Sequence, residues 1–93
     1  TTENLTELRK QIDEIDMTLI ETLAKRMRIS REIGTYKKEH EMPILQTNRY
    51  DEIINKRAQE GVELGMGNDF MKIVFEAIHS ESVRQQMTIM EGK

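Results

Sequence analysis

The sequence has 93 residues, a net charge of −3 from 14 Lys and Arg against 17 Asp and Glu, and no cysteine. This length is typical of one domain whose core is only marginally sufficient by itself, and the negative charge argues against general binding to nucleic acid or anionic membranes. The lack of cysteine excludes disulfides, thiolate nucleophiles and cysteine-based zinc sites, and no apolar run is long enough for a signal peptide or a membrane span. We therefore expect a cytoplasmic protein. The chain starts at Thr1 without Met, which fits either a processed N-terminus or a domain excised from a longer polypeptide.

A long amphipathic helix is predicted from Asn4 to about His40. Asn4 is a candidate cap with Glu7 three residues on, and Pro43 ends the helix because the residue before a proline is pushed out of helical geometry. Apolar side chains recur along it at alternating spacings of three and four residues. They are Leu5, Leu8, Ile12, Ile15 and Leu19, followed downstream by Ile29, Ile33 and Tyr36.

Two shorter helices are predicted, over about 48–60 and about 69–90. Thr47 is a candidate N-cap of the first, and Gly61 lies beyond its end. The run GVELGMGND supplies a glycine-rich loop, with Asn68 as the cap of the last helix. No strand pattern or internal repeat competes in the sequence, so the predicted fold class is all-α, with residues 1–93 as a single three-helix domain.

The first helix is too long for a compact domain of this size. At 1.5 Å per residue it spans about 55 Å, whereas such a domain is about 30 Å across. The shorter helices cannot cover an apolar stripe of that length, and a solvated stripe, the alternative, would be costly. We therefore predict a homodimer with the long helices paired, antiparallel in keeping with two-fold symmetry.

Two cations interrupt this apolar face. Arg26 occupies the position that Leu19 and Ile12 hold seven and fourteen residues earlier. Lys37 follows eleven residues later, on nearly the same face and about 16 Å along the axis. Either could be a side chain that extends to solvent, but no carboxylate continues this face between them. Together with Arg49, early in the second helix, they predict a pocket for an anionic ligand.

The third helix adds Ser82 and Gln86, four residues apart and able to hydrogen-bond one ligand, although they could also form an ordinary polar shoulder. His40 and His79 lack a companion at metal-binding spacing, so we expect no metal. No Ser or His pattern argues for covalent catalysis. The pocket suits a small polyanion whose reaction needs shaping and electrostatic stabilisation, without a cofactor.

Four stretches, in this order, resemble the all-helical chorismate mutases across essentially the whole chain. They are LRKQIDEID with Arg9, TLAKRMRISREIGTYK with Arg26 and Lys37, PILQTNRY with Arg49, and ESVRQQ with Ser82 and Gln86. The sequence is especially similar to the mutase domain fused to the C-terminus of a DAHP synthase, the first enzyme of the shikimate pathway. Such a fusion would explain a start without Met.

The resemblance implies an intertwined homodimer that rearranges chorismate to prephenate in phenylalanine and tyrosine biosynthesis. The reaction is an intramolecular 3,3-shift without cofactor or covalent intermediate. Lys37 and Gln86 would hydrogen-bond the ether oxygen, where negative charge grows as the C–O bond breaks. The two substrate carboxylates would be held by Arg9, Arg26 and Arg49, with Ser82 assisting.

Two positions depart from the family pattern. Gln46 stands where many relatives have Asp, and Tyr50 where they have Glu beside the substrate hydroxyl. Both stay candidates for holding that hydroxyl, Tyr50 through its own hydrogen bond and Gln46 through a nearby backbone group.

The resemblance places Arg9 and Arg26 in one site, but helix geometry separates them within a chain. Arg9 lies roughly 25 Å from Arg26 along one helix and about 100° around it, so a small dicarboxylate cannot touch both. If both belong to one site, Arg9 comes from the other subunit.

Two other functions stay open. An isochorismate-pyruvate lyase resembles this fold and uses a similar cationic pocket, but would release salicylate and pyruvate instead of prephenate. A non-catalytic dimerisation or regulatory module would explain the long helix through intersubunit ion pairs. That module predicts no chorismate binding.

Overall fold

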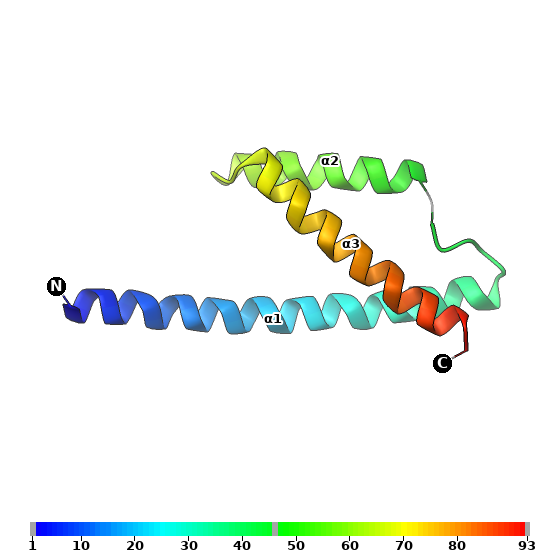
Figure 1. The fold of residues 1–93 in the computed structure, drawn as a ribbon, viewed down its shortest axis with the longest axis horizontal. Coiled ribbons are helices and arrows are strands. Elements are labelled where there is room, and N and C mark those ends of the chain that lie inside the picture. Colours follow the sequence, from blue (N-terminus) through cyan, green and yellow to red (C-terminus); the bar gives the residue numbers. More distant parts are fainter. Residues whose placement is uncertain (1, 46, 93) are drawn as a thin grey trace.

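The computed structural model describes residues 2–45 and 47–92. They form three α-helices, α1 (Thr2–Glu39), α2 (Thr47–Glu63) and α3 (Asn68–Met90), and no strand occurs among these residues. Figure 1 shows α3 running diagonally from the end of α2 to the C-terminal half of α1. The structure confirms the predicted all-α fold with one long and two shorter helices.

α3 holds the other two helices together. It packs against both α1 and α2, whereas α1 and α2 make no direct backbone contact with each other in the described part of the chain. Side chains from all three helices therefore meet where α3 joins the other two, and this is where the pocket described below is found.

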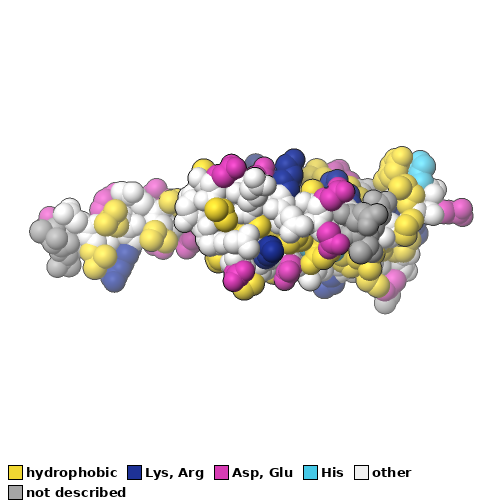
Figure 2. All heavy atoms as spheres, turned by 90° about the horizontal axis from the view of Figure 1, so that it is seen from above, with side chains coloured by type: hydrophobic (Ala, Val, Ile, Leu, Met, Phe, Trp, Pro, Cys, Tyr) yellow, Lys and Arg dark blue, Asp and Glu magenta, His cyan; other side chains and the backbone are white. Residues whose placement is uncertain are grey.

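The N-terminal half of α1 is an arm that extends beyond the rest of the molecule (Figure 1). The chain measures 59 × 28 × 13 Å along its principal axes. Ile12 is 57% exposed and Ile15 63%, and Figure 2 shows hydrophobic side chains on the surface of this arm. The stripe that sequence periodicity assigned to a buried face is thus open to solvent in a single chain. No described helix combines the length and apolar composition needed to cross a membrane.

The buried interior is small and partly polar. Ile54, Ala58 and Met71 are its buried apolar side chains, and they lie on α2 and α3. Towards α1 the buried side chains are polar, namely Ser30, Ser82 and Gln86 at 4%, 7% and 8% exposure. Buried polar groups need hydrogen-bond partners, which makes this contact a specific arrangement rather than a general apolar one.

Gly61 does not lie beyond the second helix, as predicted, but inside it. α2 continues to Glu63, and the turn that follows contains Gly65, whose φ of 91° is in the left-handed region that favours glycine. The Met66 N–H donates to the Gly61 carbonyl and the Gly65 N–H to the Val62 carbonyl, each at 3.0 Å, which is a Schellman ending. Gly61 itself is buried against Met71, and a Cβ there would overlap the Met71 side chain. This glycine allows α2 and α3 to approach closely.

Other predicted helix ends are shifted by one or two residues. α1 begins at Thr2, so Asn4 lies within its first turn instead of capping it. It ends at Glu39, and Glu41 adopts a φ of 52° while the Met42 N–H donates to the Lys37 carbonyl at 2.8 Å. Gly67, not Asn68, is the N-cap of α3, and it makes no side-chain cap hydrogen bond. The predicted Thr47 cap falls on a side chain outside those described.

Candidate active site

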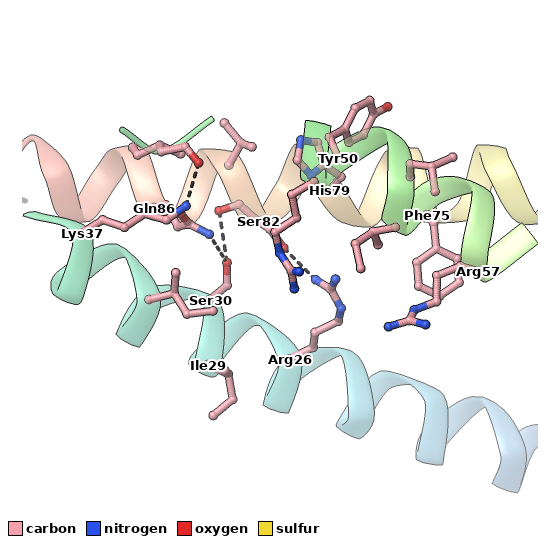
Figure 3. Close-up of a pocket in the computed structure, with 16 residues that line it drawn as sticks. Arg26, Ile29, Ser30, Lys37, Tyr50, Arg57, Phe75, His79, Ser82 and Gln86 are labelled. Carbon is pink, nitrogen blue, oxygen red and sulfur yellow. Dashed lines mark hydrogen bonds between the residues drawn. The ribbon is translucent and has the colours of Figure 1, made fainter. Parts of the chain in front are cut away.

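A pocket of about 380 Å³ lies between α1, α2 and α3. Figure 3 shows side chains from all three helices converging on it. Its lining consists of Arg26, Ile29, Ser30, Ile33, Lys37, Ile44, Arg49, Tyr50, Ile53, Ile54, Arg57, Phe75, His79, Ser82, Val83 and Gln86. The apolar part of the lining is mostly isoleucine, and each of the three helices contributes three polar side chains.

Six of the eight residues predicted for the site line this pocket. They are Arg26, Lys37, Arg49, Tyr50, Ser82 and Gln86. Arg9 is not brought to it, because it lies on the exposed N-terminal arm of α1, seventeen residues before Arg26. Gln46 lies outside the described residues.

Arg26 is fixed by α3 at one end of the pocket. Its Nη1 donates to the Ser82 Oγ at 2.9 Å, and that hydroxyl in turn contacts the Met27 sulfur at 3.7 Å. The side chain is exposed in the single chain, which corrects the expectation of a buried cation. Partial burial nevertheless lowers the pKa of the Arg26 guanidinium, and the positive charge of Arg57 lowers it further. Arg26 is thus positioned by a neutral hydroxyl and keeps its charge for a ligand.

Lys37 and Gln86 form the other end of the pocket. The Lys37 Nζ donates to the Ile44 carbonyl at 2.7 Å and to the Gln86 Oε1 at 3.3 Å. Partial burial lowers the pKa of the Lys37 ammonium, and Arg49 lowers it further. An ammonium has three N–H donors, so one remains for a ligand oxygen.

Ser30 determines how the Gln86 amide is oriented. The Gln86 Nε2 donates to the Ser30 Oγ at 3.1 Å, and the Ser30 Oγ donates to the Ser82 carbonyl at 3.3 Å. The Oε1 of Gln86 therefore accepts from Lys37, and the second N–H of the Gln86 amide remains available for a ligand. Gly34 permits this approach of α1 to α3, because a Cβ there would lie 3.1 Å from the Gln86 Cα.

The pocket is strongly cationic. Arg26, Lys37, Arg49 and Arg57 all line it, and no acidic side chain is found among its described lining residues. Like charges held together are unfavourable unless an anion joins them, so the arrangement selects an anionic ligand. The described residues contain no group of three or more His, Asp or Glu that could hold a metal ion.

His79 completes the wall beside Tyr50. The two rings are tilted against each other with centroids 4.2 Å apart. Burial lowers the pKa of the His79 imidazole below its ordinary value of 6.5, and the charges of Arg26 and Lys37 lower it further. At neutral pH this wall therefore presents an uncharged ring and a hydroxyl.

Comparison with known proteins agrees with this geometry. The sequence matches the chorismate mutase type II family over residues 8–87, a range that includes every lining residue of the pocket. The chain belongs to the chorismate mutase type II family. Membership confirms the resemblance seen in the four sequence stretches.

Relatives of this chorismate mutase family member include both short and long proteins. It is 35% identical over 78 residues to a T-protein of Enterobacter agglomerans, covering 84% of this chain and 21% of the relative. It is 27% identical over 86 residues to a 4-amino-4-deoxychorismate mutase of Streptomyces venezuelae, with 92% and 84% covered. With the chorismate mutase of Methanocaldococcus jannaschii it shares 28% identity over 88 residues, with 90% and 87% covered. The chain thus spans about a fifth of the T-protein it matches.

Sequence reasoning missed three polar residues of this chorismate mutase-type pocket. Ser30 was not predicted for the site, although its place four residues after Arg26 on the same helix was an available signal. His79 was considered only as a metal ligand. Arg57 was not predicted, because it follows Arg49 by eight residues, or about 80° around the helix axis, and this spacing does not place the two on one face.

Proposed function

We propose that this chain catalyses the rearrangement of chorismate to prephenate, as an isomerase of aromatic amino-acid biosynthesis. The observation that carries the proposal is the Lys37–Gln86 pair, fixed at 3.3 Å opposite a cluster of arginines in a member of the chorismate mutase type II family. Chorismate carries two carboxylates and an ether oxygen, and the pocket offers cations for the first and two N–H donors for the second.

The proposed mechanism uses no cofactor and no covalent intermediate. One C–O bond breaks and one C–C bond forms within the substrate, so no proton has to be transferred. Lys37 and the free N–H of Gln86 donate to the ether oxygen, whose negative charge grows towards the transition state. Because both donors are already held in place, little reorganisation is needed when that charge appears.

Substrate binding is assigned to the cations of the pocket. Arg26 and Arg49 hold the carboxylates with help from Ser82, and Arg9 of a second subunit completes the set. Tyr50 and a group near Gln46 hold the ring hydroxyl. Closed packing around this arrangement would orient the enolpyruvyl side chain over the ring, which is the main requirement of an intramolecular reaction.

The proposal includes a homodimer with paired long helices. The exposed apolar stripe of α1 supports it, since a second copy would cover that stripe at the same time as it delivers Arg9. We also propose that the chain is part of a longer protein, such as a fusion to a DAHP synthase. This proposal is compatible with the T-protein match, in which the similar region is 21% of the relative. A cytoplasmic location fits this biosynthetic role.

Chorismate is preferred to its 4-amino analogue on electrostatic grounds. Two relatives are named 4-amino-4-deoxychorismate mutases, and their substrate carries an ammonium group. The four cations of this pocket would repel that group, whereas a hydroxyl is neutral.

An assay with product identification tests the function. The purified chain is offered chorismate, 4-amino-4-deoxychorismate and isochorismate in separate reactions. We expect prephenate from chorismate with the highest kcat/KM of the three. Salicylate and pyruvate from isochorismate would instead establish the lyase, and failure to bind chorismate by calorimetry would favour the non-catalytic module.

A further inference from the structure

Arg57 is a cation of the pocket to which the proposed mechanism assigns no role. It comes from α2, eight residues after Arg49, or about 12 Å further along the helix axis. Its side chain is 35% exposed and lines the same pocket as Arg26. An arginine that was only a surface side chain would turn its guanidinium to solvent.

The Arg57 side chain is directed towards Arg26. Figure 3 shows it extending from α2 beside Phe75 into the space that the Arg26 guanidinium also faces. The two are close enough that the charge of Arg57 lowers the pKa of Arg26. Two guanidinium groups facing one space repel each other, so the fold bears an electrostatic cost at this end of the pocket.

Glu60 offsets only part of that cost. Its Oε1 accepts from the Arg57 Nη1 at 2.6 Å, but the Glu60 side chain is 51% exposed and lies outside the pocket lining. Surface ion pairs of this kind contribute little. A guanidinium has five N–H donors, so Arg57 can keep this contact and still bind a carboxylate through its other nitrogens.

We infer that Arg57 is a further substrate-binding residue, which joins Arg26 around one carboxylate of the substrate. The inference rests on the proposed function and adds to it a residue that none of the four family-like stretches contains. In this arrangement one carboxylate bridges two guanidinium groups from different helices, α1 and α2. The ligand, and not a direct contact, then ties these two helices together at this end of the pocket.

Substitution of Arg57 with matched controls tests this assignment. Arg57→Gln removes the charge but keeps hydrogen-bonding capacity, and Arg57→Lys keeps the charge but loses the planar fork. Lys56→Gln removes the same charge from the neighbouring exposed position, which lies outside the pocket. Glu60→Gln frees Arg57 from its ion pair. Circular dichroism and native mass spectrometry establish that each variant is folded and assembled like the parent.

We expect Arg57→Gln to raise the KM for chorismate about tenfold or more, as for the loss of a charged hydrogen bond, with kcat changed less than about threefold. Arg57→Lys should lie between parent and Arg57→Gln. Lys56→Gln should stay within about twofold of the parent KM, and Glu60→Gln should leave KM unchanged or lower it.

A KM for Arg57→Gln equal to that of the parent would overturn the assignment. An equal rise of KM in Arg57→Gln and Lys56→Gln would also overturn it, since it would show a general charge effect. A loss of the dimer without a change in KM would do the same, since it would place Arg57 in an intersubunit contact. If the parent itself does not convert chorismate, the proposed function fails separately. Calorimetry then compares the affinity of Arg57→Gln and Lys56→Gln for chorismate. Weaker binding by Arg57→Gln alone supports the assignment of Arg57, and equal binding overturns it.

Discussion

At the scale of single residues, the proposed mechanism separates the groups that hold the substrate from the groups that act on its reacting atoms. The arginines differ from Lys37 and Gln86 in what they contact: Arg26 is fixed by a neutral hydroxyl, whereas Lys37 and Gln86 are fixed by each other and by Ser30. A donor pair held in this way is preorganised for an oxygen that becomes negative. Loss of a member of the pair should therefore affect kcat more than KM.

Lys37→Ala is predicted to lower kcat by about two orders of magnitude or more, the scale of losing one preorganised oxyanion-type donor. The variant should remain folded, because Lys37 is partly exposed and its contacts are polar. Stopped-flow or continuous measurement of chorismate loss gives kcat and KM. The adjacent Lys38→Ala is the control, since Lys38 is exposed and lies outside the pocket. An unchanged kcat in a folded Lys37→Ala protein would contradict the proposed mechanism.

His79 should make the stability of the fold depend on pH. Burial, with Arg26 and Lys37, lowers its pKa below 6.5 in the folded chain, so well above pH 6.5 the imidazole is almost entirely neutral in both the folded and the unfolded states. As pH falls below that value, the unfolded chain takes up a proton that the folded chain resists, and the free energy of unfolding decreases. Denaturation at pH 7.5 and pH 5.5 should show this decrease in the parent and a smaller one in His79→Gln. The exposed His40→Gln is the control, and a slope equally reduced by both variants would contradict the prediction.

At the scale of helices, the contact between α2 and α3 depends on Gly61. An alanine in the interior of a helix usually stabilises it by about 0.5–1 kcal/mol relative to glycine. Here the added Cβ would overlap Met71, so we predict that Gly61→Ala destabilises by about 1–3 kcal/mol through overpacking. Urea denaturation of parent, Gly61→Ala, Met71→Ala and the double variant gives the coupling between the two positions. A stabilised Gly61→Ala protein would contradict the prediction and mean that the Met71 side chain moves aside at little cost.

The helices could be predicted from sequence because their apolar periodicity extends over many turns. Their ends could not, because they depend on tertiary contacts and on single backbone conformations. Gly61 looked like a stop signal, but it is a contact with Met71, and the stop is the left-handed Gly65. Glu41 ends α1 in a conformation that a non-glycine residue seldom adopts, so composition gave no sign of it.

For the site as well, sequence patterns within one helix could be predicted, whereas contacts between helices could not. Residues on one face of one helix, such as Arg26 and Lys37, could be grouped by spacing alone. Arg57 and His79 could not be added, because their inclusion depends on how α2 and α3 cross, which no single helix encodes. Ser30 could be placed on the right face, but its hydrogen bond to Gln86 requires the actual separation of α1 and α3.

At the scale of the whole molecule, the shape of one chain supports the proposed homodimer. It extends 59 Å in one direction and 13 Å in another, and much of the apolar stripe on α1 is solvent-exposed. A surface of this kind is stabilised by burial against a second copy, and closed two-fold symmetry is the commonest way to provide one. Antiparallel pairing of two α1 helices would place the arm of each chain beside the pocket of the other.

This arrangement predicts that activity requires residues from two chains. Arg9 lies on the arm and Arg26 in the pocket, so Arg9→Ala and Arg26→Ala homodimers should each be nearly inactive. A mixed dimer of the two variants would carry both lesions in one pocket and none in the other. After joint unfolding and refolding, activity should therefore return, up to about half the parent rate per mixed dimer because one of its two pockets is intact. One variant is labelled uniformly with ¹⁵N before mixing, because the two variants have identical masses. Native mass spectrometry then measures the fraction of mixed dimers, and the recovered rate should increase in proportion to it. If mixed dimers form and stay inactive, Arg9 acts within its own chain or only in folding, and the pocket is not shared between subunits.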